Sequence, residues 1–280
     1  RQLPADKMLS AHEDMVDSLK PENGATIAEA IMTTDTFPKQ AAASFTISGK
    51  EFNIAGVAKG SGMIAPNMAT LLSFIVTDAP VDRSFLDTTF KKLIKTTFNA
   101  ITIDGDMSTN DTAIILSPVS EKYYSSETEL SDFLKALEFV MNRLAELLIE
   151  DGEGATKGVK IYVKGAATDD DAVLISRAVS ESLLVKTAIF GNDPNWGRIA
   201  CAAGYSGAAI EEKKLSIYLE DKPLFLNGKP TDIDYSSIEE ILTRRNYTIT
   251  IDIGLGTGES YMFTTDISYD YVKINAQYST

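Results

Sequence analysis

The longest regular pattern in the sequence runs from Glu129 to Ile149, where apolar side chains recur every three or four residues. This spacing is typical of one buried face of an α-helix. The turn at Asp151-Gly152 then ends the helix, as glycine after a helix commonly does. Around it, short alternating or β-branched segments predict strands, most of them joined as hairpins. Helices mixed with hairpins along one chain favour an α/β or α+β sandwich, in which helices flank mixed sheets.

The remaining pattern places further elements on both sides of that helix. The expected helices cover residues 8–19, 26–32, 82–96, 170–183 and 238–245. The expected strands cover a hairpin at 44–54 and the segments 71–77, 113–116, 159–163, 215–219, 224–226, 247–253 and 260–265. With 280 residues and 44% hydrophobic side chains, the chain can bury one large core or two smaller ones. A boundary near residues 153–158 is expected.

Charge and composition exclude several classes of protein. The net charge of −14 argues against a nucleic-acid binder, which needs a basic surface. No stretch of ~18 apolar residues predicts a membrane span. The start of the sequence shows neither the apolar core of a signal peptide nor the Arg/Ser bias of a transit peptide. The single cysteine, Cys201, excludes an intrachain disulfide and fits a reducing compartment.

The chain has only one histidine, His12, which lies in an amphipathic helical stretch and is interpreted as a surface residue. A Ser-His-Asp triad and a histidine-based metal centre are then both unavailable. Any nucleophilic chemistry must use a different base.

Three segments carry polar residues and glycines that periodicity does not explain. In the first, residues 56–70, Thr70 directly precedes an apolar strand and by residue type alone is an ordinary strand residue. Its spacing does not match a phosphate-binding loop of the Walker type. In the second, residues 97–112, Asp104, Asp106 and Asp111 would suit a hard cation, but a tight turn stabilised by polar side chains is the favoured alternative. In the third, residues 151–157, Glu153 stands between two glycines, open to an ammonium or hydroxyl group, although residue types alone favour a solvated turn.

Two other glycine-rich runs are interpreted as structural. Residues 254–258 follow a strand but precede another strand, which excludes a dinucleotide-binding fingerprint. Residues 191–198 are expected to form a loop that carries the only tryptophan, with Arg198 facing a carboxylate.

Six blocks resemble the ornithine acetyltransferases, the arginine-biosynthesis family also called glutamate N-acetyltransferase. The most specific is Lys59-Gly-Ser-Gly-Met-Ile-Ala-Pro-Asn-Met-Ala-Thr70, which is similar to the family's processing site. The others are residues 30–39, 97–112, 151–157, 191–199 and 274–280, in the same order and spread over essentially the whole chain. The resemblance implies a fold of the self-processing N-terminal-nucleophile type. It assigns residues 1–156 to a catalytic domain and residues 157–280 to a smaller C-terminal α/β domain that contributes substrate contacts.

The resemblance also implies a reaction. Family members cut themselves before the threonine that corresponds to Thr70, here between Ala69 and Thr70. The new terminal threonine then passes acetyl from N2-acetylornithine to glutamate. Its free α-amine, with a reference pKa of ~7.7–8.0, would replace the missing histidine as the base. Matching the motifs residue by residue points to substrate contacts at Thr33, Lys59, Thr70, Glu153, Asn275 and Thr280, with Thr34 as the alternative to Thr33.

The charges of two of these residues suggest roles. Lys59 would face a substrate carboxylate, and Glu153 the side-chain ammonium of ornithine. No metal and no cofactor is expected, and acetyl-CoA as a second acetyl donor stays open. The two cleavage fragments are expected to remain together as a heterodimer that assembles into a heterotetramer. No nucleic acid and no membrane is expected as a partner. The location is cytoplasmic, or the mitochondrial matrix in a eukaryotic member.

One departure from the family is expected to matter. Its members carry a longer amino-terminal region, with a Thr-Gly pair resembling an oxyanion hole upstream of the position of Arg1. Losing such a donor costs ~10²–10³ in rate, so these 280 residues alone are expected to be impaired. The alternatives are a related self-processing amidohydrolase or aminopeptidase that uses water as acceptor, and an inactive protein that only binds a ligand.

Overall fold

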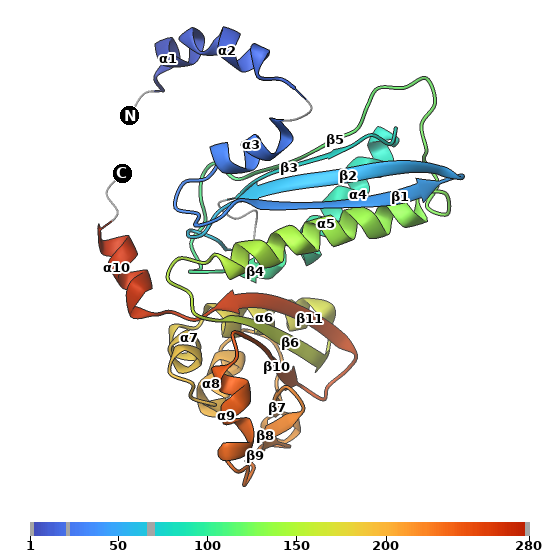
Figure 1. Ribbon diagram of the computed structural model, residues 1–280. Coiled ribbons are helices and arrows are strands. Elements are labelled where there is room, and N and C mark those ends of the chain that lie inside the picture. The colour runs from blue at the N-terminus through green and yellow to red at the C-terminus, as the bar shows by residue number, and fades with distance from the viewer. Residues whose placement is uncertain (1–2, 21–22, 66–70, 278–280) are drawn as a thin grey trace.

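A computed structural model of the protein describes residues 3–20, 23–65 and 71–277. Two sheets, each with its own helices, follow one another along the chain (Figure 1). The first sheet has four strands in the order β1-β2-β3-β5. They are β1 (Lys39–Ile47), β2 (Lys50–Lys59), β3 (Leu72–Thr77) and β5 (Thr112–Leu116).

The hairpin predicted at 44–54 is the start of this sheet, and it is longer than its alternation suggested. Strands β1 and β2 pair from Ile47↔Lys50 to Lys39↔Ala58. Ser48 and Gly49 both have positive φ, 50° and 80°, the conformation that lets a two-residue turn follow the twist of the strands. Strand β3 runs antiparallel to β2 and parallel to β5.

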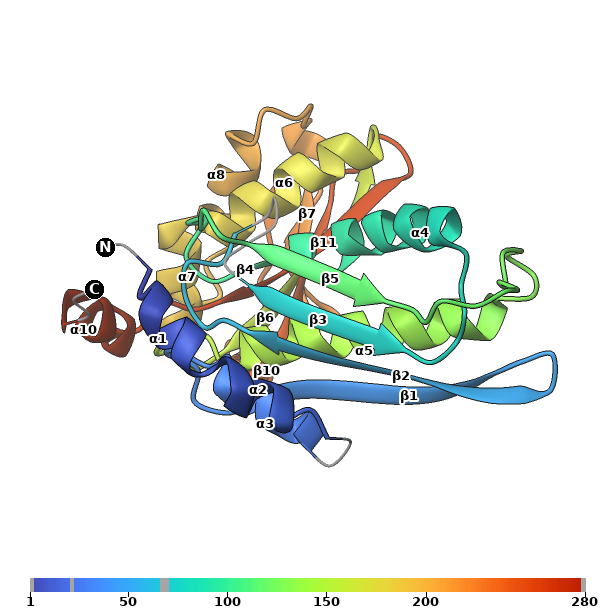
Figure 2. The same cartoon turned by 90° about the horizontal axis from the view of Figure 1, so that it is seen from above.

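Helices cover one face of this sheet. The predicted long helix is α5 (Ser131–Glu150), which buries nine side chains. Figures 1 and 2 show it lying along the strands, where Phe133 packs edge-on against Phe45 of β1. Helix α4 (Arg83–Thr96) begins where predicted, because the Asp82 carboxylate accepts hydrogen bonds from the amides of Ser84 and Phe85 and so caps its first turn.

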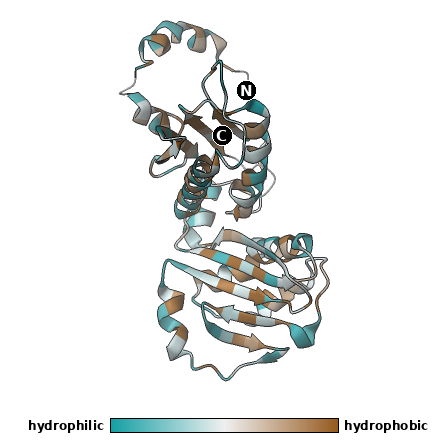
Figure 3. Cartoon of the chain, turned by 90° about the vertical axis from the view of Figure 1, so that its right-hand side faces the viewer, coloured by the Kyte–Doolittle hydropathy of each residue, from teal (hydrophilic) through white to brown (hydrophobic). Residues whose placement is uncertain are grey.

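The second sheet has seven strands in the order β4-β11-β6-β10-β7-β8-β9. They are β4 (Ile101–Thr102), β6 (Gly158–Ala166), β7 (Ser216–Leu219), β8 (Lys222–Leu226), β9 (Lys229–Pro230), β10 (Asn246–Asp252) and β11 (Gly258–Thr265). Its helices are α6 (Asp169–Glu181), α7 (Leu183–Phe190), α8 (Trp196–Gly204) and α9 (Ser236–Thr243). Figure 3 shows hydrophobic bands alternating with polar ones along the strands of this lower sheet, as expected where one face is buried. The predicted combination of mixed sheets and flanking helices is therefore present.

The apolar interior forms two clusters. One extends from Phe45 to Ile149 and the other from Val159 to Ile253. The division falls where the domain boundary was expected, although β4 lies in the first segment and pairs with β11 of the second. We keep the division into residues 1–156 and 157–280 as a proposal.

Three expectations about helices were wrong in detail. The stretch 8–19 forms two short helices, α1 (Ala5–Ser10) and α2 (His12–Asp17), which meet at Ala11 and bury no side chain. His12 is exposed, as expected. The helix expected at 26–32 is α3 (Gly24–Ala30). The helix expected at 170–183 stops at Glu181, because Ser182 turns out of the helix and caps α7 by accepting from the amide of Val185.

The loop expected at 191–198 instead leads into α8. The Asn195 side chain accepts from the amide of Arg198 and caps this helix, and Trp196 stacks on Phe225 with ring centroids 4.6 Å apart. The Arg198 guanidinium donates to the carbonyl of Leu184 at 2.9 Å and to the hydroxyl of Thr187 at 3.2 Å. The expectation that it faces a carboxylate was wrong.

A last helix, α10 (Tyr269–Gln277), follows the second sheet and was not predicted, since it buries no side chain. Within residues 3–20, 23–65 and 71–277, no helix combines the length and the apolarity that a membrane crossing requires.

Candidate functional site

Lys59 and Thr33 meet at the end of β2. The Lys59 ammonium donates to the Thr33 hydroxyl at 2.7 Å, although the two residues lie 26 positions apart. Lys59 is the last residue of β2 and is paired with Leu72, the first residue of β3. The chain that follows Thr70 therefore starts its strand directly beside the Lys59–Thr33 pair.

Thr34 has a different partner from Thr33. Its hydroxyl lies 2.7 Å from the hydroxyl of Ser61, a buried residue of the glycine-rich loop. Both threonines thus face the 59–62 segment, but only Thr33 contacts the lysine ammonium. This arrangement favours Thr33 as the substrate contact.

Glu153 lies on the other side of the same loop. Its amide donates to the Ser61 carbonyl at 2.7 Å, and its carboxylate accepts from the Asn275 side chain at 3.0 Å. A Cβ at position 62 would lie 2.5 Å from the Glu153 carboxylate oxygen. Glycine at position 62 therefore allows this approach, and the expected residues Glu153 and Asn275 come together.

Helix α10 reaches this site because it is anchored at its start. The Ser268 hydroxyl donates to the carbonyl of Gly154 at 2.6 Å. Gly154 has φ 64°, and a side chain there would collide with the backbone at Tyr271. The unpredicted helix thus brings Asn275, 122 positions away in sequence, to Glu153.

Ala69, Thr70 and Thr280 lie outside the described residues. The described chain resumes at Leu71, whose carbonyl accepts from the amide of Thr112 at 3.0 Å. Asp111 is the neighbour of Thr112. Burial raises the pKa of its carboxyl group to about 6, although a hydrogen bond from the amide of Leu71 acts in the opposite direction. A carboxyl that titrates near neutral pH therefore lies next to the start of the strand that follows Thr70.

Asp104 stabilises the part of the glycine-rich loop at residues 63 and 64. Its carboxylate accepts from the amides of Met63 at 2.6 Å and Ile64 at 3.0 Å, and from that of Asp106 at 3.2 Å. Burial raises the pKa of Asp104 in spite of these three amides. The turn interpretation of residues 97–112 fits this geometry. No group of three metal-binding side chains occurs in the part of the chain that the structure describes.

A buried ion cluster behind the site was not found from the sequence. The Lys39 ammonium contacts the carboxylates of Asp35 at 2.7 Å and Asp151 at 2.5 Å. Burial alone would raise the pKa of Asp35, but hydrogen bonds from Lys39 and from the amides of Gly60 and Thr33 hold it below its ordinary value. The only sequence signal was the pairing of opposite charges four residues apart, which more often marks an exposed helix face.

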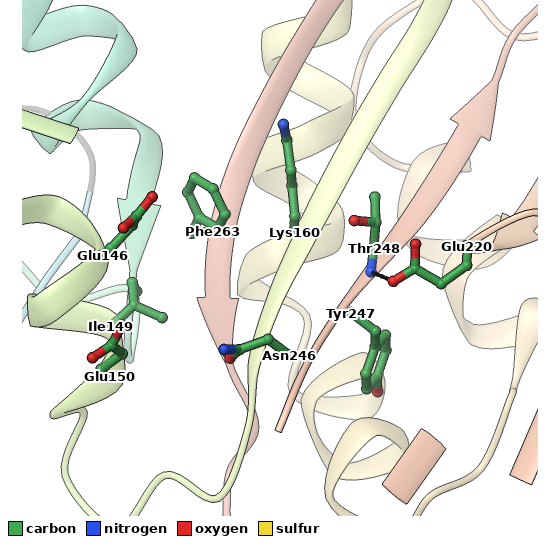
Figure 4. Close-up of a pocket in the computed structure, with 10 residues that line it drawn as sticks. Glu146, Ile149, Glu150, Lys160, Glu220, Asn246, Tyr247, Thr248 and Phe263 are labelled. Atoms are coloured by element: carbon green, nitrogen blue, oxygen red, sulfur yellow. Dashed lines mark hydrogen bonds between the residues drawn. The ribbon is translucent and has the colours of Figure 1, made fainter. Parts of the chain in front are cut away.

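A separate pocket of about 450 Å³ lies between α5 and the second sheet. Figure 4 shows Glu146, Ile149 and Glu150 of α5 facing Phe263, Lys160 and other residues of the strands. The Glu220 carboxylate in the wall of this pocket accepts a hydrogen bond from the amide of Thr248 at 2.9 Å. The predicted site residues that the structure describes, Thr33, Lys59, Glu153 and Asn275, do not line this pocket, so we do not place the reaction there.

The site around residues 59–62 carries two opposite charges. Lys59 can bind a carboxylate and Glu153 an ammonium group, and threonine and asparagine side chains beside them can donate further hydrogen bonds. A zwitterionic amino-acid derivative matches this pattern. The polar groups converge beside the strand that begins just after Thr70, which is where an acyl-accepting hydroxyl would be needed.

Comparisons with known proteins show the family of this chain. The model of the ArgJ family matches residues 1–280. The arginine biosynthesis bifunctional protein ArgJ of Geobacter sulfurreducens is 47% identical over 282 residues, which cover 99% of this chain and 72% of that protein. The glutamate N-acetyltransferase of Methanocaldococcus jannaschii is 45% identical over 264 residues, covering 90% of this chain and 65% of that protein.

A solved structure extends the likeness to the fold. The crystal structure of the arginine biosynthesis bifunctional protein argJ from Bacillus halodurans superposes with a TM-score of 0.67 at 34% identity, and the match covers 73% of this chain and 98% of that one. The predicted fold class, an α/β sandwich of the self-processing type with mixed sheets and flanking helices, is confirmed.

Proposed function

This chain belongs to the ArgJ family, and we propose that it transfers acetyl from N2-acetylornithine to glutamate through an acetyl ester of Thr70. As a member of that family it is an acyltransferase of arginine biosynthesis. The observation that supports the site is the convergence of the Lys59–Thr33 and Glu153–Asn275 pairs on the loop that leads to residue 70.

The two charges give the donor a defined orientation. Lys59 binds the α-carboxylate of acetylornithine, and Glu153 binds its side-chain ammonium. The acetamide between them is then held toward Thr70. Thr33 and Asn275 orient the two charged groups through their hydrogen bonds, at 2.7 and 3.0 Å. Holding a reactant in this way supplies much of the rate by removing its freedom of orientation.

The reaction proceeds in two acyl transfers. Thr70 Oγ attacks the acetamide carbon, the C–N bond breaks, and the α-amine of Thr70 passes the hydroxyl proton to the leaving ornithine amine. The amine of glutamate then attacks the ester, forms N-acetylglutamate and returns a proton to Thr70 Oγ. Lys59 binds the α-carboxylate of glutamate in the same way as it binds the α-carboxylate of acetylornithine.

Thr70 acquires its free amine by self-cleavage. Its Oγ attacks the carbonyl carbon of Ala69, the peptide rearranges to an ester, and water hydrolyses the ester. The second fragment would then be residues 70–280, which make up 211 of the 280 residues.

The cleavage products are proposed to stay together as a heterodimer and to assemble further into a heterotetramer. Strands β1 and β2 precede the cut, whereas β3, β5 and α5 follow it. The β2–β3 ladder from Lys59↔Leu72 to Ile54↔Thr77 would hold the fragments to each other. A cytoplasmic or mitochondrial location also remains a proposal.

Intact mass and acetyl transfer, measured on the natural protein as its gene encodes it, test this function. We expect the wild type to give two fragments that meet at Ala69/Thr70, with one acetyl group gained by the second fragment after incubation with acetylornithine. Thr70→Ala should stay uncut and inactive, whereas Thr70→Ser keeps a hydroxyl nucleophile and should be cut.

An uncut wild type with full acetyl transfer would contradict the mechanism. Transfer to water but never to glutamate would identify an amidohydrolase instead. Replacing acetylornithine by acetyl-CoA in the same assay tests the second donor.

A further inference from the structure

Lys39 is fully buried, and its ammonium is surrounded on three sides by acceptors. It contacts Asp35 and Asp151 at 2.7 and 2.5 Å, and the carbonyl of Phe37 at 3.4 Å. The side chains of the two aspartates are 1% and 2% exposed. The Lys39 ammonium lies between the two buried carboxylates, so its positive charge offsets the repulsion between them.

Each carboxylate is also bonded to the backbone of a segment that carries a proposed substrate contact. Asp35 accepts from the amide of Thr33 at 3.0 Å and from that of Gly60, the neighbour of Lys59, at 2.7 Å. Asp151 accepts from the amide of Thr36 at 2.9 Å and from the Thr36 hydroxyl. Asp151 lies two residues before Glu153.

We propose that Lys39 is a positioning residue for acetyl transfer, because its ammonium between Asp35 and Asp151 fixes the segments of Thr33, Lys59 and Glu153 relative to one another. The inference rests on the proposed function. Lys39 itself lies behind the site and contacts none of the three proposed substrate contacts in the hydrogen bonds described above. It acts through the two carboxylates and the amides they hold.

This arrangement has a specific consequence for substrate selection. The donor is recognised at two ends, its carboxylate at Lys59 and its side-chain ammonium at Glu153. The distance between those two charges is set by the Asp35–Lys39–Asp151 cluster. If the three charges of the cluster are removed, kcat/KM should fall more for a donor that is bound at both ends than for a donor that is bound only through its carboxylate.

The test compares acetylornithine with N-acetylnorvaline, which has the same carbon chain without the side-chain amine. The principal variant, Lys39→Met with Asp35→Asn and Asp151→Asn, removes all three charges but keeps oxygen acceptors for the amides. The ratio of kcat/KM for the two donors is measured on the natural protein, together with self-cleavage and thermal unfolding. Lys186→Met is the matched control, because Lys186 is also fully buried but its ammonium donates to the Thr264 hydroxyl and the Thr265 carbonyl and not to Asp35 or Asp151.

We expect the wild type to prefer acetylornithine and the triple variant to lose that preference by about fivefold or more, mainly through KM, since small displacements of positioning groups have large effects on rate. Lys186→Met should keep the wild-type ratio even if it lowers stability. A general structural role would reduce the amount of active protein and leave the ratio unchanged.

A folded triple variant with the wild-type ratio overturns the positioning role. If the triple variant does not fold, the single variant Asp151→Asn tests the positioning role instead, because it retains the Lys39–Asp35 pair. It should show the same loss of preference for acetylornithine over N-acetylnorvaline. A wild type without acetyl transfer would overturn the proposed function and this inference together, whereas a wild type that transfers acetyl separates the two.

Discussion

Of the lysines that the structure describes, Lys39 in the first half and Lys186 in the second have fully buried side chains, and their surroundings differ. Lys39 is 0% exposed and lies against two carboxylates within 2.7 Å. Lys186 of α7 is 1% exposed and is bonded to neutral oxygens, the hydroxyl of Thr264 at 2.7 Å and the carbonyl of Thr265 at 2.6 Å. Burial lowers the pKa of Lys186 to about 7, against the attraction of Asp104, Asp266 and Glu181.

The difference separates two uses of a buried cation. The Lys39 cluster joins backbone segments from three parts of the chain and lies directly behind the candidate site. Lys186 joins α7 to β11 through hydrogen bonds to neutral oxygens, so burial of its charge costs stability that the surrounding packing must offset. In the first half, the buried charge of Lys39 is proposed to align the site. In the second half, the buried charge of Lys186 lies among structural residues and is assigned no role in the site.

Removing one aspartate from each half should give the largest contrast. Asp151→Ala leaves Lys39 with a single carboxylate and Thr36 without its acceptor, which should lower the free energy of unfolding by ~3–5 kcal/mol. Asp266→Ala removes an acceptor for the amides of Thr156 and Lys157 and should cost ~1–3 kcal/mol. Urea unfolding of both variants measures the difference, and equal losses would remove the distinction between the two halves.

The pH dependence of stability sharpens the contrast further. The folded state releases the Lys186 proton near pH 7, whereas the unfolded chain holds it up to about 10.5. The unfolded state therefore binds more protons between these values, and the free energy of unfolding should rise with pH by at most ~1.4 kcal/mol per unit. Lys186→Met should flatten this rise in denaturant titrations from pH 7 to 9.5. An unchanged slope in the variant would show that Lys186 is not its source.

A single methyl group tests the site at a smaller scale. Gly62→Ala places a Cβ 2.5 Å from the Glu153 carboxylate and should displace it from Asn275. We expect the KM for acetylornithine to rise about tenfold, or ~1.4 kcal/mol of binding, with a smaller change in kcat. The control from the second half is Gly191→Ala, where the nearest atom would lie 3.4 Å away. Similar KM values for both variants would count against Glu153 as a substrate contact.

Exposed charges should matter least in either half. Lys91 and Asp87 form an ion pair at 2.8 Å with side chains 71% and 58% exposed. Lys91→Met should change the free energy of unfolding by less than ~0.5 kcal/mol. Thermal unfolding measures this change. If Lys91→Met lowered the free energy of unfolding as much as Asp266→Ala, burial would not determine how much a polar interaction contributes to the stability of this protein.

The elements that the sequence predicted well are those with a strong local pattern. Helix α5 has an uninterrupted apolar stripe, and α4 has its capping aspartate. The elements that were missed or misjudged lack such a stripe. Helix α8 follows Pro194-Asn195, a pair that resembles a loop, although asparagine directly before a helix is also a helix cap. Helix α10 buries nothing and has no periodicity to detect.

The candidate site was harder to predict than the fold. Residue types alone favoured a solvated turn at Glu153, and it was the family resemblance that singled out Lys59, Glu153 and Asn275. Their pairings join positions 26 and 122 residues apart, which no local pattern encodes. Lys39 was not singled out, because a lysine four residues from an aspartate usually lies on a surface, and only the complete fold buries it.

The β2–β3 ladder has a consequence for how the protein refolds before and after the proposed cut. Before the proposed cut, β2 and β3 belong to one chain, and folding is a unimolecular process. Afterwards the same ladder joins two polypeptides, so refolding from the denatured state becomes bimolecular and depends on protein concentration. The mature enzyme would then persist because it unfolds slowly, and a molecule that has lost its fold in dilute solution would rarely regain it.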